Sequence, residues 1–156
     1  MRIFQLLDLK KGFSLPLWVV ASAKAAVKKL LDLPFDSHEF IKIPDSNDVK
    51  KIKVHSVASI KENNAALAIT IANSGLHLDI TNNLEIWVVA SFVKIENLEN
   101  VLKGINDLVP GYGVGIDFNT EKICISGFAK EIIEVNLLEL IPEAVSYTHL
   151  TLPTIE

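Results

Sequence analysis

The chain has 156 residues, of which 49% are hydrophobic and 22% charged, and this balance excludes a disordered or low-complexity protein. A chain of this length folds around one hydrophobic core. Its formal net charge of −4, with basic and acidic residues interspersed, argues against nucleic-acid binding. The single cysteine, Cys124, excludes an internal disulfide and fits a reducing compartment. The uncharged segment 12–23 is too short to cross a bilayer, so we expect a soluble, cytoplasmic protein without a membrane span.

The first third of the chain predicts one helix after an uncertain start. Residues 1–9 predict an edge strand or a leader without fixed structure. Charged residues interrupt this apolar start before it is long enough to resemble a secretory signal. Leu17–Leu33 predicts a helix, since apolar residues recur there at three- and four-residue spacing. Pro16 suits the first turn, Ser14 or a neighbour would cap it, and Pro34 would end the helix.

Two segments that alternate apolar and polar residues follow, Glu39–Ile43 and Lys50–Val57, and they predict half-exposed strands joined as a hairpin. The second strand carries a small basic patch, which we interpret as a solvated strand edge; its members are Lys50, Lys51 and Lys53. Neither His38 nor His55 has a partner at metal-ligand spacing, so we predict no metal site.

Two apolar runs, Ala65–Ala72 and Leu84–Phe92, predict two largely buried strands at the centre of the fold. Trp87 lies on the second, and Trp87→Ala should cost about 3–5 kcal/mol if that strand is interior. Between the runs, residues that favour turns, such as Gly75 and Asp79, form an elbow. Spacing alone leaves open whether this elbow builds a site or is an ordinary loop.

The remaining segments complete an α+β class, with a mostly antiparallel or mixed sheet and two or three helices. Glu96–Leu108 is helix-periodic, and Ala129–Leu140 is helical or mixed. Between them a glycine-rich stretch, residues 110–115, precedes a predicted hairpin of Ile116–Phe118 with Lys122–Ile125. In this hairpin we expect Cys124 to be a buried small hydrophobic residue. The glycines lack the strand–helix context of a dinucleotide loop, and a close approach of backbone or of a flat ligand is the alternative.

Three stretches, in order, resemble motifs of the CbiD family, the cobalt-precorrin-5B C1-methyltransferases of anaerobic cobalamin biosynthesis. Gly12-Phe13 and Ala23-Lys-Ala-Ala26 are similar to its opening glycine–aromatic pair and alanine-rich helix. Residues 72–81, with Glu85-Ile86, resemble its central Lys-Asp-Ala-Gly-Asp-Asp-Pro-Asp-Val-Thr motif and the Glu-Ile that follows. Gly111-Tyr-Gly-Val-Gly115 matches its Gly-x-Gly-Val-Gly.

The resemblance implies methylation at C1 of a cobalt-corrinoid intermediate, with S-adenosylmethionine as the methyl donor. The ligand-binding positions that it implies are Gly75, Asp79, Thr81, Glu85, Gly113 and Gly115. For each of them, a purely structural role in shaping a turn or strand remains the alternative. No catalytic base stands out, and methyl transfer to an electron-rich carbon depends mainly on how the reactants are positioned.

The departures from the family pattern support a second hypothesis. Leu15 and Leu17 stand where the family's Thr-Thr-Gly-Thr-Cys-Ala run has hydroxyl groups. Three polar positions of the central motif have also changed, to Ala72, Leu76 and His77, within the altered run Leu76-His-Leu78. A non-catalytic relative that binds a tetrapyrrole or a partner protein would show such losses. From the sequence alone, the non-catalytic binding protein therefore stays an alternative to the enzyme.

The last twelve residues, 145–156, resemble one reading frame of the transposon-end adapter used in sequencing libraries. We therefore expect residues 1–144 to be the amino-terminal domain of a CbiD-like protein whose carboxy-terminal domain is missing, so that this fragment alone is inactive. The surface left by the missing half should be apolar and should favour self-association; the predicted residues are Val135, Leu137, Leu138 and Leu140.

Overall fold

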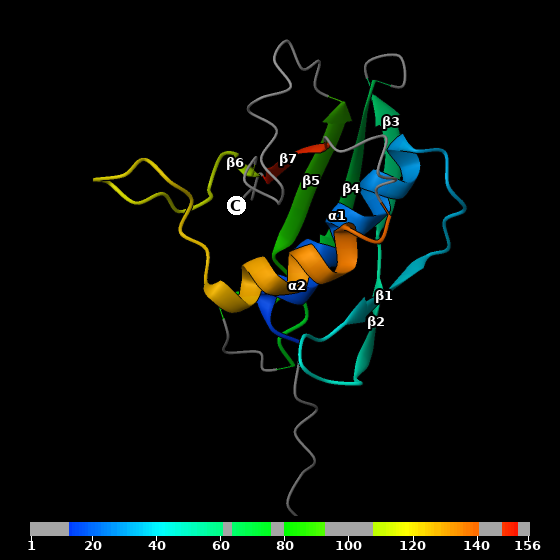
Figure 1. Cartoon of the computed structure of the whole chain (residues 1–156), viewed down its shortest axis with the longest axis horizontal. Helices are drawn as coiled ribbons and strands as arrows, with labels where there is room; N and C mark the ends of the chain where they lie inside the picture. The colour runs from blue at the N-terminus through cyan, green and yellow to red at the C-terminus, as the bar shows by residue number, and fades with distance from the viewer. Residues whose placement is uncertain (1–12, 61–63, 76–79, 93–107, 141–147, 153–156) are drawn as a thin grey trace, which may run out of the picture.

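The computed structural model describes residues 13–60, 64–75, 80–92, 108–140 and 148–152 (Figure 1). The predicted segment 1–9 and all but the last residue of the predicted helix Glu96–Leu108 lie outside these residues; Leu108 itself begins a strand, so its helical prediction is wrong. Two helices and several strands confirm the α+β class. In chain order the elements are α1 (Leu15–Leu30), β1 (His38–Lys42), β2 (Val49–Lys53), β3 (Ser56–Ile60), β4 (Ala65–Ile71), β5 (Glu85–Phe92), β6 (Leu108–Pro110), α2 (Gly127–Leu137) and β7 (Thr148–Leu152).

The strands form two sheets, and the larger has the order β3-β4-β5-β7-β6. Neighbouring strands in this sheet are antiparallel, except for β6 and β7, which run parallel to each other. β1 and β2 form a separate antiparallel hairpin. The prediction of one strand over Lys50–Val57 is wrong, because the chain changes sheets within it. The N–H of Val54 still donates to Ser37 at 2.9 Å beside β1, whereas the N–H of His55 donates to Ile69 of β4 at 2.7 Å.

Helix α1 lies between the two sheets and is the most enclosed element (Figure 1). It contacts β3, β4 and β5 on one side and β1, β2 and α2 on the other. Eleven of its 16 residues are buried, many of them alanines, which let the helix approach the sheet closely. Its buried Ser22 hydroxyl lies 2.8 Å from the Thr70 hydroxyl of β4, which in turn donates to the carbonyl oxygen of Trp18 at 3.0 Å.

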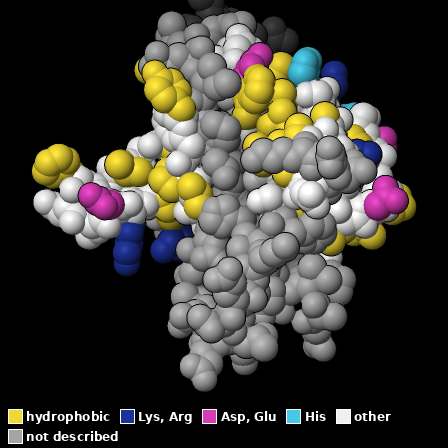
Figure 2. Space-filling view, turned by 90° about the horizontal axis from the view of Figure 1, so that it is seen from above, with side chains coloured by type: hydrophobic (Ala, Val, Ile, Leu, Met, Phe, Trp, Pro, Cys, Tyr) yellow, Lys and Arg dark blue, Asp and Glu magenta, His cyan; other side chains and the backbone are white. Residues whose placement is uncertain are grey.

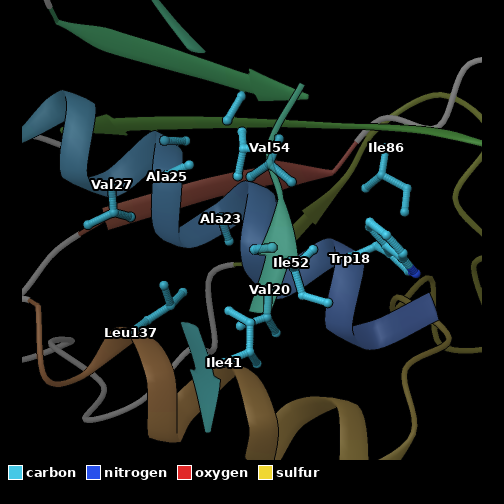
Figure 3. Packing of buried hydrophobic residues seen from close by; sticks show 14 of the residues in the cluster. Trp18, Val20, Ala23, Ala25, Val27, Ile41, Ile52, Val54, Ile86 and Leu137 are labelled. Carbon is cyan, nitrogen blue, oxygen red and sulfur yellow. The ribbon is translucent and has the colours of Figure 1, made fainter. Parts of the chain in front are cut away.

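Helix α2 packs against α1 and β1 on the side away from the large sheet. Figure 3 shows Val20 of α1, Ile41 of β1 and Leu137 of α2 directed into the space among the three elements. A buried amide fixes the arrangement: Asn136 accepts a hydrogen bond from the N–H of Lys42 at 2.8 Å and donates to its carbonyl at 2.9 Å. This side chain closes the free edge of β1 with the end of α2.

The two central strands match their predicted bounds within one residue, but their two faces differ. Ile86 and Val88 of β5 are buried against α1, whereas Trp87 and Val89 point to the opposite face and are only half-buried. The indole N–H of Trp87 donates to the exposed Glu85 carboxylate at 3.1 Å. The prediction of two largely buried strands is therefore confirmed for the face toward α1, whereas the opposite face is half-buried.

On the face drawn in Figure 2, the coloured Lys side chains are scattered among Asp and Glu side chains rather than gathered. The predicted basic patch is divided, since Lys51 and Lys53 are exposed while Lys50 is half-buried on the other face of β2. Neither described helix is long and apolar enough to span a bilayer.

Candidate functional site

A cavity of about 330 Å³ lies at the amino-terminal end of α1. Three parts of the chain form its walls: the first turns of α1, the glycine-rich stretch, and the segment that leads into the first turns of α2. Ile86 of β5 contributes as well. The lining residues are Leu15, Pro16, Val19, Ile86, Gly113, Val114, Gly115, Ile123, Cys124, Ile125, Ser126, Ala129 and Ile133.

The first wall is formed by the amino-terminal turns of α1, and the local sequence determines where this helix begins. Ser14 is the N-cap residue, although its side chain makes no capping hydrogen bond, and its carbonyl accepts from the N–H of Leu17 at 3.1 Å. Pro16 lies in the first turn, where the missing N–H costs nothing. Leu15, Pro16 and Val19 then present an apolar edge of α1 to the cavity. The predicted helix end is wrong, since α1 stops at Leu30, four residues before Pro34.

The glycine-rich stretch forms the second wall. Gly113 has a φ of 80°, a conformation that suits glycine. The N–H of Cys124 donates to the carbonyl of Gly115 at 2.9 Å, and Ile116 and Ile123 form an isolated antiparallel bridge. The predicted hairpin is therefore present, but only as this short contact. Cys124 is exposed and lines the cavity, so the prediction of a buried cysteine in a strand is wrong.

The tip of this hairpin is held by one aspartate and projects from the body of the molecule, as Figures 1 and 2 show on the left. The Asp117 carboxylate accepts hydrogen bonds from the hydroxyl of Thr120 at 2.9 Å, from its N–H at 2.8 Å, and from the N–H of Asn119 at 3.0 Å. These bonds, the Thr120 hydroxyl first, hold the pKa of Asp117 below its ordinary value of 3.8. The turn thus holds together the two chain segments that carry Gly115 and Cys124.

The start of α2 forms the third wall. Ser126 is its N-cap, and the serine hydroxyl accepts a hydrogen bond from the N–H of Ala129 at 3.1 Å. The sequence prediction began this helix at Ala129 and so missed Ser126 as a site residue. A serine directly before a helix-periodic apolar run is the signal that would have identified it.

Of the six predicted ligand-binding residues, the structure brings Gly113 and Gly115 to the cavity. Gly75, Thr81 and Glu85 are not among its lining residues, and Asp79 lies outside the described residues. Glu85 is exposed and bonded to Trp87. The cavity residues that the prediction missed come from three other segments, and their proximity is a tertiary feature that spacing along the chain does not contain.

The elbow nevertheless lies at the same end of α1 as the cavity. The N–H of Phe13, two residues before Leu15, donates to the carbonyl of Asn73 at 3.2 Å. The elbow has the predicted turn chemistry: Gly75 has a φ of 75°, and its N–H donates to the Asn73 side chain at 2.9 Å. Asn83 also has a positive φ, 65°.

The alanine-rich motif residues 23–26 lie elsewhere. All four are buried, and none lines the cavity. The Lys24 ammonium donates to the carbonyl of Phe40 at 3.0 Å and to the Glu139 carboxylate at 3.2 Å, and Lys42 also pairs with Glu139. Partial burial raises the pKa of Glu139, but the hydrogen bonds from Lys42 and Lys24 outweigh it and leave the pKa below 4.5. In this chain the motif lysine therefore joins α1, β1 and the end of α2.

The chemistry of the cavity is that of an apolar binding site. Ser126 and Cys124 are the two lining residues with polar side chains, and no lining residue is a carboxylate, lysine or histidine. Among the described residues no group of three or more His, Cys, Asp or Glu side chains could hold a metal ion. A site of this kind binds and orients a ligand and excludes water, while its residues supply little acid–base catalysis.

Comparison with known proteins identifies the family of this chain. The model of the CbiD family matches residues 5–153. The chain is 54% identical over 134 residues to a cobalt-precorrin-5B C(1)-methyltransferase from Prochlorococcus marinus (strain MIT 9515), covering 86% of this chain and 36% of the relative. A second relative of that name, from Synechococcus sp. (strain CC9605), is 37% identical over 131 residues, which cover 84% of this chain and 34% of the relative.

A solved structure shares the fold. The 1.9 Å crystal structure of the cobalamin biosynthesis protein cbiD from Archaeoglobus fulgidus matches with a TM-score of 0.59 at 16% identity, covering 92% of this chain and 43% of that one. The chain thus spans about a third of the length of the curated relatives that it matches. On the family model, the relatives and the shared fold together, the chain belongs to the CbiD family.

Proposed function

We propose that this chain is the amino-terminal part of an enzyme that transfers a methyl group from S-adenosylmethionine to C1 of cobalt-precorrin-5B. Family membership is the observation that carries the proposal, since the Prochlorococcus relative is named for this reaction and is 54% identical. We also propose that the enzyme works in the cytoplasm, as its single cysteine suggests. The chain spans 36% of that relative, so the proposal concerns what this part contributes.

The cavity at the end of α1 is suited to part of such a ligand. Its volume of about 330 Å³ lies at the lower end of the range of small-molecule sites, about 300–1,000 Å³. The glycine backbone at Gly113 and Gly115 allows close approach of a flat group. No carboxylate lines the cavity, so a ribose diol or an amino group would need partners from outside it. The fit is therefore to the apolar part of a ligand.

When bound, S-adenosylmethionine supplies an electrophilic methyl group on a positively charged sulfur. Attack by the electron pair of a ring carbon would form the new C–C bond, and the electrons of the broken S–CH₃ bond would leave the sulfur neutral. Because positive charge on the sulfur is lost in this step, an apolar enclosure such as the walls around Val19 and Ile133 does not oppose it. The residues of this chain would act by positioning the reactants.

One observation favours the second function, a non-catalytic relative that binds a tetrapyrrole. Leu15, which replaces a hydroxyl residue of the family pattern, lines the cavity and makes it more apolar. Leu17, the other replacement, is buried in the core with 5% of its surface exposed, so it cannot contact a ligand directly. Tetrapyrrole binding without binding of the methyl donor would identify this function.

We also propose that residues 1–144 are the natural portion of the chain and that residues 145–156 derive from a sequencing adapter. In the fold, β7 from this last segment pairs with β5 and β6. This proposal can be tested by sequencing the source DNA beyond codon 144. The proposal predicts that the intact reading frame continues into the remaining family-length sequence, and a stop codon after Glu156 in that DNA would overturn it.

Methyl transfer can be tested with a family-length protein, in which the matched part of this chain replaces the corresponding 134 residues of the Prochlorococcus relative. The protein is incubated with cobalt-precorrin-5B and isotope-labelled S-adenosylmethionine. We expect the label in the corrinoid at C1, located by NMR. A folded protein that binds the corrinoid but transfers no label supports the non-catalytic function instead.

A further inference from the structure

We propose that the open face of the five-stranded sheet, opposite α1, binds the part of a CbiD-family polypeptide that lies outside the third matched by this chain. This inference rests on family membership and not on the proposed reaction. We call this surface the open face. Its apolar residues are Ala58 and Ile60 of β3, Ala65, Leu67, Ile69 and Ile71 of β4, and Trp87 and Val89 of β5; the small side chain of Ala65, between Ile60 and Ser91, is the one that is buried.

The register places these side chains on one surface. Ile69 is opposite Trp87, and Leu67 is opposite Val89 on one neighbour and Ala58 on the other, so their side chains project from the same face. The residues between them, such as Ala68 and Val88, are buried on the other face against α1. The strands β4 and β5 thus carry apolar residues on both faces.

Among the described residues, no element covers the open face. α1 contacts β3, β4 and β5 from the other side, and α2 and the β1–β2 hairpin contact α1. Leu67, Ile69, Trp87 and Val89 are half-buried and lie outside the core cluster. Antiparallel sheets that face water on one side alternate apolar and polar residues, whereas strands that are apolar on both faces are typical of sheets covered on both.

The length of the family members indicates which polypeptide segment covers the open face. This chain covers 36% of the Prochlorococcus relative and 43% of the Archaeoglobus protein, so more than half of each polypeptide lies outside the matched region. An apolar sheet face flanked by polar groups, here Glu85 and Ser56, fits an interface that is permanently covered within one polypeptide.

The docking residues predicted in α2 and directly after it do not form a comparable apolar surface. Leu137 is 1% exposed and packs in the core, which contradicts its predicted role, and Leu140 is half-buried against the same cluster. Val135 and Leu138 are exposed, 40% and 55%, but they are two side chains on a helix surface. Single exposed apolar residues are common on soluble proteins, whereas a contiguous apolar sheet face is not.

The test uses two neighbouring exposed residues of β3, Ala58 on the open face and Ser59 on the opposite face. Ala58→Cys and Ser59→Cys are made separately in a Cys124→Ser background. Each variant is studied in the 156-residue chain and in the family-length protein. The rate of alkylation at each cysteine is followed by peptide mass spectrometry. Both sites are exposed in the described structure, so neither substitution should disturb folding, and circular dichroism checks this.

We expect alkylation of Ala58→Cys to be at least about tenfold slower in the family-length protein than in the chain alone, while Ser59→Cys reacts equally in both. Equal rates for Ala58→Cys in the two proteins would overturn the proposal. Slow alkylation of Ala58→Cys in the chain alone would also overturn the proposal. A rate that falls as the chain concentration rises would show that a second copy covers the open face. A slow rate that does not depend on concentration would show that the chain itself covers the open face. Methyl-transfer activity plays no part in this readout, so either proposal can fail without the other.

Discussion

The backbone N–H of Phe13 donates to the carbonyl oxygen of Asn73 across 3.2 Å, which ties the elbow between β4 and β5 to the start of α1. Phe13 also lies against Trp18, with ring centroids 6.0 Å apart. Two of the three family-like stretches therefore meet at one end of α1, and the third, which includes Gly113 and Gly115, lines the cavity at that same end. This meeting point is where we expect ligands to bind.

Gly115→Ala should weaken ligand binding without weakening the fold. A methyl group added at Gly115 would lie 3.8 Å from the Cβ of Cys124, an ordinary contact, so protein atoms leave room for it. We expect an unchanged free energy of unfolding and a several-fold weaker affinity for S-adenosylmethionine or the corrinoid, measured by calorimetry.

The matched control is Gly113→Ala. Gly113 has a φ of 80°, so alanine should cost about 1–2 kcal/mol of stability through backbone strain. Loss of stability in Gly115→Ala as well would mean that the effect of both glycines is structural, and it would contradict their proposed contact with a ligand.

The buried hydroxyl pair of Ser22 and Thr70 should behave as one unit. Their oxygens are 2.8 Å apart, and both residues are fully buried. Thr70→Val and Ser22→Ala should each cost about 1–3 kcal/mol in chemical denaturation, because each removes the buried hydrogen bond between the two hydroxyls. The double variant should cost clearly less than the sum of the two. Additive costs would show that the two hydroxyls act independently.

Acid should weaken the attachment of α2 through Glu139. Hydrogen bonds from Lys42 and Lys24 hold the pKa of Glu139 below its ordinary value of 4.5 in the folded state, in spite of partial burial. A lowered folded pKa gives stability that is present above pH 4.5 and lost as the pH falls through the folded value. Glu139→Gln should therefore reduce the loss of stability on acidification below pH 4.5. Glu131→Gln, on the exposed side of α2, is the control and should leave the pH profile unchanged.

Trp87→Ala should cost about 2 kcal/mol in the chain alone, less than the 3–5 kcal/mol typical of a fully buried tryptophan. The reason is that Trp87 is half-buried on the open face, although β5 has a neighbouring strand on each side. Ile132→Ala, at a fully buried position of α2, provides the comparison at about 2–5 kcal/mol. A cost above 3 kcal/mol for Trp87→Ala would mean that something in the chain already covers the open face.

The sequence predicted well those elements whose signal is local. The bounds of β4 and β5 follow from short runs of Ile, Val and aromatic residues. The start of α1 was predicted within two residues, because Pro16 marks a first turn. The division of β2 from β3 was missed, since alternation continues through Val54 and only pairing with Ser37 and Ile69 separates the two.

The site was predicted only in part for a similar reason. The two glycines were identified because a family motif includes them. Cys124 was assigned to a buried strand from its apolar neighbours, yet a short hairpin exposes it at the cavity. The wall from Ser126 to Ile133 depends on how α2 packs against α1, a contact between helices that are far apart in the sequence and that no local pattern encodes.

The most direct test of the account is calorimetric titration of the family-length protein with S-adenosylmethionine, before and after the cavity is filled. Val19→Trp places a large side chain at the cavity wall, and Val135→Trp, on the exposed surface of α2, is its control. We expect that the parent protein and Val135→Trp bind equally and that Val19→Trp binds at least about tenfold more weakly. A folded parent protein that does not bind, or a Val19→Trp variant that binds as well as the parent, would contradict it.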